Sequence, residues 1–60
     1  MIPGQEFYNL KFGDKVLTNR YGVGTVMKNM NIFKRSVPLK IDIRPHGCSY
    51  FFRNEIKEKL

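Results

Sequence analysis

The chain has 60 residues, which is close to the smallest length at which a hydrophobic core alone supports folding. Eleven Lys and Arg residues against five Asp and Glu give a formal net charge of +6. The length leaves room for one domain and excludes an enclosed cofactor cavity, so we expect no cofactor. The basic balance favours an anionic partner, either nucleic acid or an acidic protein surface.

Single copies of the reactive residues exclude several kinds of chemistry. Cys48 is the only cysteine and His46 the only histidine, so neither a disulfide framework nor a metal site is expected within one chain. We expect Cys48 to be a small packed residue and His46 to be an exposed turn residue. No catalytic motif is present, and we predict that the protein is not an enzyme.

The beginning of the chain has neither the basic nor the apolar stretch of a secretion signal. No apolar run approaches the ~18 residues that a membrane-spanning helix requires. We therefore expect a cytoplasmic protein without a membrane partner.

The chain contains no alanine and is rich in β-branched and aromatic residues, which favours strands over helices. Residues 1–12 are expected to form a lead-in segment that packs on the domain. Its apolar residues should cover one end of the core: Phe7, Tyr8, Leu10 and Phe12. Residues 7–10 fit either a turn of helix or an edge strand.

Turn residues recur at short spacing after Gly13-Asp14 and divide the rest into short strands. Strict alternation over 39–44 predicts that Leu39, Ile41 and Ile43 face the core. Ile56 and Leu60 should also face it. The expected strands are 15–18, 23–30 (or to 32), 39–44, 48–53 and 57–60, with a 3₁₀ turn at 54–56.

Five short strands with a 3₁₀ turn before the last are typical of one all-β architecture. We predict that residues 13–60 form a single five-stranded SH3-like barrel. Closing the sheet would protect edges that a small open sheet exposes.

The segment from Phe12 to Val26, Phe-Gly-Asp-Lys-Val-Leu-Thr-Asn-Arg-Tyr-Gly-Val-Gly-Thr-Val, carries a family resemblance over residues 12–27. It resembles the small Tudor-like C-terminal domain of UvrD/PcrA-type helicases. It is also similar to the RNA-polymerase-interacting domain of CarD and transcription-repair coupling factor. The shared pattern is Gly-Asp-x-Val, a short loop, an aromatic or His, and Gly-x-Gly with Thr-Val or similar. This pattern also occurs in KOW-like modules, so the resemblance implies a Tudor- or KOW-like barrel. The resemblance implies a binding module in transcription or DNA metabolism, with the β subunit of RNA polymerase as the usual partner.

These residue types also have a physical reason. The Asp14 carboxylate suits a turn in which it accepts backbone N–H groups. Gly22 and Gly24 suit positions that need a positive φ or a close backbone approach. The loop between the first two strands should then project Arg20 and Tyr21 outward.

Cations interleaved with exposed aromatic rings are typical of single-stranded nucleic-acid binding. At least one of Tyr50, Phe51 and Phe52 should be exposed, because successive strand residues point to opposite faces. Arg44 and Arg53 lie on consecutive strands and are candidates for one shared face. The full set of candidate binding residues is Arg20, Tyr21, Lys34, Arg35, Arg44, Tyr50 and Arg53.

The composition and these candidates predict a non-catalytic module that binds DNA or RNA through a basic, aromatic-containing face. The alternative is a protein–protein adaptor that docks on RNA polymerase or another nucleic-acid enzyme, in the manner of a phage or plasmid modulator. A homodimer is a further expectation, since burying one face would add the stability that a small core lacks.

Overall fold

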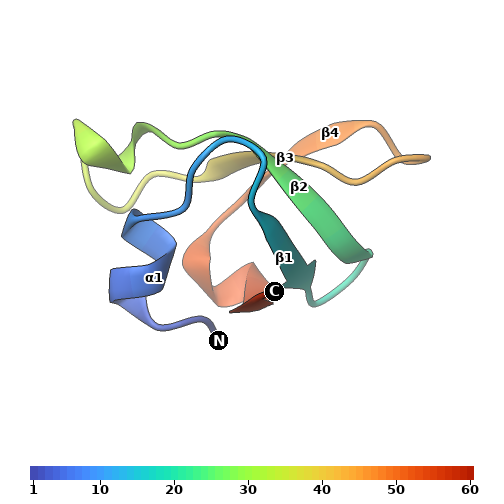
Figure 1. Cartoon of the computed structure of the whole chain (residues 1–60), viewed down its shortest axis with the longest axis horizontal. Coiled ribbons are helices and arrows are strands. Elements are labelled where there is room, and N and C mark those ends of the chain that lie inside the picture. Colours follow the sequence, from blue (N-terminus) through green and yellow to red (C-terminus); the bar gives the residue numbers. More distant parts are fainter.

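The computed structural model describes all 60 residues and consists mainly of one antiparallel sheet (Figure 1). A short helix packs at one end, and the hairpin of the third and fourth strands extends at the other. In chain order the elements are α1 (Gly4–Tyr8), β1 (Lys15–Thr18), β2 (Gly22–Lys28), the 3₁₀ turn η1 (Met30–Ile32), β3 (Leu39–Asp42), β4 (Cys48–Phe51), the 3₁₀ turn η2 (Arg53–Glu55) and β5 (Ile56–Lys59).

The five strands lie in the order β4-β3-β2-β1-β5, and every neighbouring pair is antiparallel. All five predicted strands and the predicted 3₁₀ turn are present, with ends shifted by a few residues. No ladder joins β4 to β5, so closure of the sheet into a barrel is not shown.

A cluster of ten buried residues forms the core and draws on the lead-in segment as well as the sheet. The alternation predicted in β3 is confirmed, since Leu39, Ile41 and the following Ile43 are buried. The core members are Ile2, Phe7, Leu10, Val16, Val26, Leu39, Ile41, Ile43, Phe51 and Ile56.

Residues 7–10, left open between helix and strand, belong to the end of α1 and the turn after it. The Asn29 carboxamide, just after β2, stabilises this end of the helix. It donates to the carbonyl oxygens of Phe7, Tyr8 and Leu10 at 3.2, 3.3 and 2.8 Å. The Phe7 carbonyl also accepts the Leu10 N–H at 3.4 Å, so the carboxamide adds a second donor there and supplies the donors of the Tyr8 and Leu10 carbonyls.

The prediction that Phe12 covers the core is wrong, because its side chain is 74% exposed. Phe12 lies in the tight turn that Asp14 closes by accepting the Lys11 N–H at 2.9 Å. Gly13, at φ 91°, completes the reversal. A residue at the tip of such a turn points away from the sheet.

Strand β2 ends at Lys28, before the predicted end at residue 30 or 32. The Asn29 side chain accepts the Asn31 N–H at 2.9 Å and starts η1. Buried Asn31 then bonds both main-chain groups of Val37 at 3.0 and 3.2 Å. These side-chain bonds compete successfully with continuation of the strand.

Leu60 was expected in the core and is exposed instead, whereas Ile56 is buried as predicted. Thr18 pairs with Ile56 but its neighbour Leu17 pairs with Glu58, so β5 carries one extra residue. Such a bulge reverses the alternation of the residues that follow it. Leu60 therefore points away from the core that Ile56 occupies.

The two glycines of the Gly-x-Gly pattern have the two different roles expected of them. Gly22 has φ 72°, in the left-handed region that glycine tolerates. Gly24 permits a close approach, since a Cβ there would lie 2.5 Å from Cγ2 of Ile41. None of the helical segments has the length and apolar character needed to cross a membrane.

Candidate functional site

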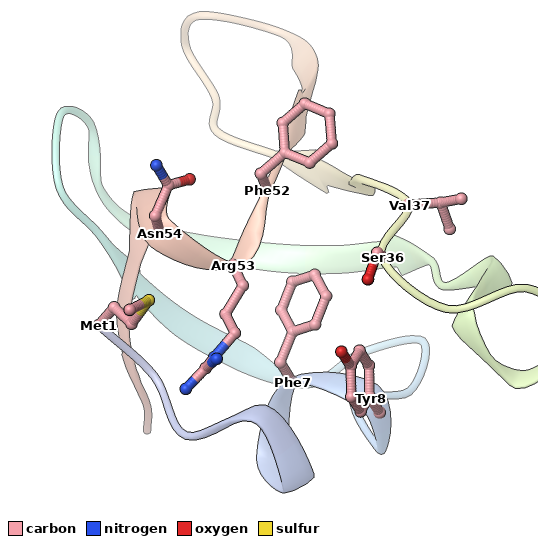
Figure 2. A pocket seen from close by; sticks show the side chains of 8 residues that line it. All are labelled: Met1, Phe7, Tyr8, Ser36, Val37, Phe52, Arg53 and Asn54. Atoms are coloured by element: carbon pink, nitrogen blue, oxygen red, sulfur yellow. The ribbon is translucent and has the colours of Figure 1, made fainter.

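A hollow of about 290 Å³ opens beside α1, where the segment before β3 and the turn η2 meet the lead-in (Figure 2). Five of its eight lining residues are hydrophobic. The lining residues are Met1, Phe7, Tyr8, Ser36, Val37, Phe52, Arg53 and Asn54. A second hollow is entirely polar and carries charges of both signs; it is lined by Gln5, Glu6, Asn9, Lys11, Asp14 and Lys59.

Arg53 supplies the fixed positive charge of the first hollow. Its half-buried side chain donates from Nε to the carbonyl oxygen of Ile2 at 2.7 Å. Gly4 lies beside the guanidinium group: a Cβ on Gly4 would be 3.6 Å from Cζ of Arg53. The chain has a single ion pair and Arg53 is not part of it, so the guanidinium charge has no carboxylate partner.

A second arginine, in the segment before β3, contacts one of the residues that line this hollow. The Arg35 guanidinium lies over the Tyr8 ring, 4.5 Å from its centroid. Tyr8 in turn meets Phe7 edge to face, with 5.7 Å between ring centroids. Arg35 also lacks a carboxylate partner, and the neighbouring Lys34 is exposed.

The hollow therefore combines aromatic surface with unpaired positive charge, and no acidic residue lines it. The Ser36 hydroxyl and the Asn54 carboxamide line it as well, and neither has a hydrogen-bond partner within the chain. A pocket of this composition suits a ligand with a planar group and a negative charge.

Arg20 and Tyr21 form a separate group at the β1–β2 turn. The Thr18 hydroxyl accepts the Tyr21 N–H at 3.0 Å and donates to the Gly22 carbonyl at 2.8 Å. The Tyr21 ring packs 5.2 Å from His46 and 6.0 Å, edge to face, from Phe51. Arg20 lies 5.8 Å from the centroid of the same ring, so Tyr21 is half covered rather than projecting freely.

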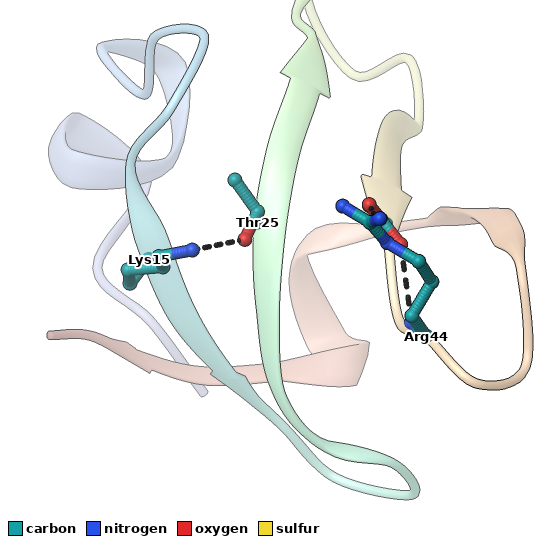
Figure 3. Close-up of polar contacts among 4 residues, drawn as sticks. Lys15, Thr25 and Arg44 are labelled. Carbon is teal, nitrogen blue, oxygen red and sulfur yellow. Dashed lines mark hydrogen bonds and ion pairs between the residues drawn. The ribbon is translucent and has the colours of Figure 1, made fainter.

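Arg44 does not share a face with Arg53, contrary to the expectation. Arg44 follows β3 at the turn of the hairpin, whereas Arg53 follows β4 at the other end of it. The Arg44 Nε donates to Oδ2 of Asp42 at 2.8 Å, and the Arg44 backbone N–H donates to Oδ1 at 3.1 Å (Figure 3). This ion pair neutralises Arg44. The same view shows Lys15 donating to Thr25 across β1 and β2.

Tyr50 and Phe52 are both exposed and Phe51 is buried, which confirms the alternation expected in this segment. Tyr50 pairs with Lys40 across β4 and β3, and Lys28 pairs with Lys40 across β2 and β3. The outer face of the sheet therefore carries two facing lysines beside an exposed tyrosine ring.

Cys48 is exposed at the start of β4, so the expectation of a packed cysteine is wrong. Strand β4 is paired on one side only and covers the core with Phe51 alone. His46 is exposed, as predicted, with its ring against Tyr21. No group of three His, Cys, Asp or Glu side chains is placed to hold a metal ion.

Sequence reasoning missed Tyr8 as a site residue and treated Phe52 only as one of three candidates for exposure. Three consecutive aromatic residues after Ser49 indicated an exposed ring, because successive strand residues point to opposite faces. Nothing in the sequence placed Tyr8 beside Arg35, which requires the contact between α1 and the segment before β3.

No model of a known protein family matches the chain, and neither curated proteins nor solved structures show a significant match to it. The resemblance of residues 12–27 to helicase and CarD-type domains gains no support from these comparisons. The structure establishes a small domain built on a five-stranded antiparallel sheet.

Proposed function

We propose that the protein is a non-catalytic module that binds nucleic acid through the basic, aromatic hollow beside α1. One observation carries this proposal. Arg53 lines an aromatic hollow that no acidic residue lines, Arg35 lies over the ring of Tyr8 in its wall, and neither arginine has a carboxylate partner.

Unpaired guanidinium groups bind phosphate well because their donors match two phosphate oxygens at once. The contact of Arg53 Nε with the Ile2 carbonyl fixes the group while its two terminal nitrogens keep free donors. Little side-chain entropy is then lost on binding, which favours this arginine over a freely moving surface lysine.

Further cations extend the surface beyond the hollow. Tyr50 and Phe52 are two residues apart in an extended segment and therefore point to the same side of it. Lys40 and Lys28 continue from Tyr50 across the sheet. A phosphate backbone leaving the hollow would meet these two lysines. Lys28 and Lys40 face each other and repel, and a bound phosphate would reduce this repulsion.

The test is fluorescence anisotropy of labelled single-stranded and duplex DNA and RNA over a salt series. We expect binding that weakens with salt, with a slope of about −1.5 to −3.5 in log K against log salt for two to four phosphate contacts. Arg35→Gln should lower the magnitude of the slope by about one.

Arg44→Gln is the matched control, because it removes the same charge from a residue that Asp42 already neutralises. It should change the affinity less than Arg35→Gln does. Binding that is independent of salt, or equal losses for the two variants, would overturn the proposal.

We also propose that the sheet is that of an SH3-like barrel. The strand order and the 3₁₀ turn directly before β5 support this assignment. The resemblance of residues 12–27 to helicase and CarD-type modules agrees with it and with a cytoplasmic role in nucleic-acid metabolism. Nuclear Overhauser contacts between β4 and the β5 edge would establish closure, and their absence would leave an open sheet.

A second candidate function is docking on RNA polymerase or another nucleic-acid enzyme. The observation that favours it is an apolar tip, defined here as Ile32 and Phe33, which are 72% and 78% exposed. The bonds of Asn29 and Asn31 hold this tip in shape, and Lys34 and Arg35 follow it directly. Exposed apolar residues beside cations suit an apolar protein pocket with an acidic rim.

Purified bacterial RNA polymerase is the probe for this candidate. A chain with both tip residues replaced by serine should lose binding to the polymerase in biolayer interferometry and keep its affinity for nucleic acid. Unchanged polymerase binding by this variant would remove the tip from the interface.

A further inference from the structure

We infer that the hollow receives one unpaired base of a single strand, with Phe52 as the stacking surface and Arg53 and Arg35 as phosphate contacts. This inference rests on the nucleic-acid binding proposed above and specifies the ligand of the same site. It follows from the size of the hollow, from the position of Phe52, and from the adjacency of ring and cation along the chain.

The size of the hollow limits its occupant. About 290 Å³ is just below the ~300–1,000 Å³ range of small-molecule pockets. Phe7 is almost fully buried and forms the apolar floor, while Phe52 leaves about half of its side chain exposed. Such a space admits one planar ring. A base pair inside a duplex has its faces covered by its neighbours and cannot enter it.

The turn η2 fixes Phe52 at the mouth of the hollow (Figure 2). The Phe52 N–H donates to Oε1 of Glu55 at 2.9 Å, and the Glu55 N–H donates to the Phe52 carbonyl at 3.0 Å. These reciprocal bonds hold the backbone that carries the ring. They also occupy Glu55, the nearest carboxylate in the sequence, so that it leaves the arginine next to Phe52 unpaired.

Phe52 thus presents a stacking ring, and the adjacent Arg53 presents donors for phosphate. One nucleotide carries its base and its phosphate on the same sugar, so it can contact both residues at once. The free Ser36 hydroxyl and Asn54 carboxamide can bond the edge of a base seated on Phe52. Tyr50 offers a comparable exposed ring but lines no hollow. It therefore provides the matched control for the stacking role of Phe52.

The experiment compares three labelled probes at low salt: a short oligothymidylate, an abasic strand of the same length, and a duplex. The first two carry the same backbone charge and differ only in their bases. One aromatic stacking contact should make the protein bind the oligothymidylate about tenfold more tightly than the abasic strand. Phe52→Ala should abolish this preference and leave the affinity for the abasic strand unchanged, whereas Tyr50→Ala should keep most of the preference.

A 2-aminopurine base in the single strand gives an independent measurement, because its fluorescence falls when it stacks on an aromatic ring. We expect quenching by the native chain and by Tyr50→Ala, and none by Phe52→Ala. Phe52 is half exposed, so its replacement should leave the fold intact; circular dichroism of each variant checks this.

The outcomes separate the two proposals. Equal binding of the abasic strand and the oligothymidylate, or tighter binding of the duplex, would contradict the inference that the hollow receives a base. Binding of phosphate by the arginines would still be supported. Failure of all three probes to bind at low salt would contradict both the proposed nucleic-acid binding and the inference that the hollow receives a base.

Discussion

Replacing Gly24 with alanine tests the packing that shapes the sheet. Gly24 pairs with Val16 of β1, and the side chains of Ile41 in β3 and of Ile43 just after it pass close to Gly24. An added Cβ would lie 2.5 Å from Cγ2 of Ile41 and 3.2 Å from Cγ2 of Ile43. Both neighbours are buried β-branched side chains with little room to turn away.

The expected cost can be worked out from this geometry. Overpacking a well-filled core costs about 1–3 kcal/mol. Alanine also lowers the conformational entropy of the unfolded chain relative to glycine, which stabilises the folded state by about 0.4–1 kcal/mol. The middle of each range gives a net loss of about 1–2 kcal/mol. A domain of this size gives about 4–8 °C per kcal/mol, so Tm should fall by about 4–16 °C.

Thermal and urea unfolding of a double-mutant cycle with Ile41→Leu would identify the clash. Leucine lacks the Cγ2 methyl, so Gly24→Ala should cost at least about 0.5 kcal/mol less in that background. Gly22→Ala is the control: the φ of 72° strains the alanine, but nothing lies within 4 Å of the added methyl. Its cost should therefore be the same with isoleucine or leucine at residue 41. An unchanged Tm for Gly24→Ala, or a cost independent of residue 41, would refute the reasoning.

Three further predictions follow from polar contacts. Asn29→Ala should cost about 1–3 kcal/mol, because it removes the side-chain donor that three carbonyls share and leaves those of Tyr8 and Leu10 without one. Hydrogen exchange of α1 should accelerate, and unchanged exchange would show that the helix does not depend on this side chain. Thr18→Val should lose about 1 kcal/mol in urea unfolding through its bonds to Gly22 and Tyr21, and no loss would mean that water replaces them. Asp42→Asn should change stability by less than about 1 kcal/mol while raising nucleic-acid affinity at low salt, because it frees Arg44; unchanged affinity would place Arg44 outside the interface.

Strand content could be predicted from the sequence because it depends on neighbouring residues. The alternation of Leu39, Ile41 and Ile43 against charged residues identifies both a strand and its buried face. Gly13 and Gly47 both have a positive φ in their turns, a conformation that glycine adopts more readily than other residues. These signals are local, and they were sufficient to place five strands.

The candidate site could be predicted only in composition. Arg35, Arg53 and the exposure of one aromatic ring after Ser49 were expected. The pairing of Arg35 with Tyr8 and of Arg44 with Asp42 was not, although both decide which cations remain available. Whether a surface arginine is free or neutralised depends on contacts that a list of charges does not contain.

The sequence by itself determined a small basic domain of short antiparallel strands, because charge, alternation and turn residues act over a few neighbouring positions. The tertiary structure decided which residues of the final segments face inward: one extra residue in β5 turns Leu60 outward while Ile56 stays in the core. It also decided where the hollow lies, since its walls come from the first eight residues, the segment before β3 and the turn η2. These parts are distant in the chain and meet only when the core closes, so no local pattern can specify the site that they form.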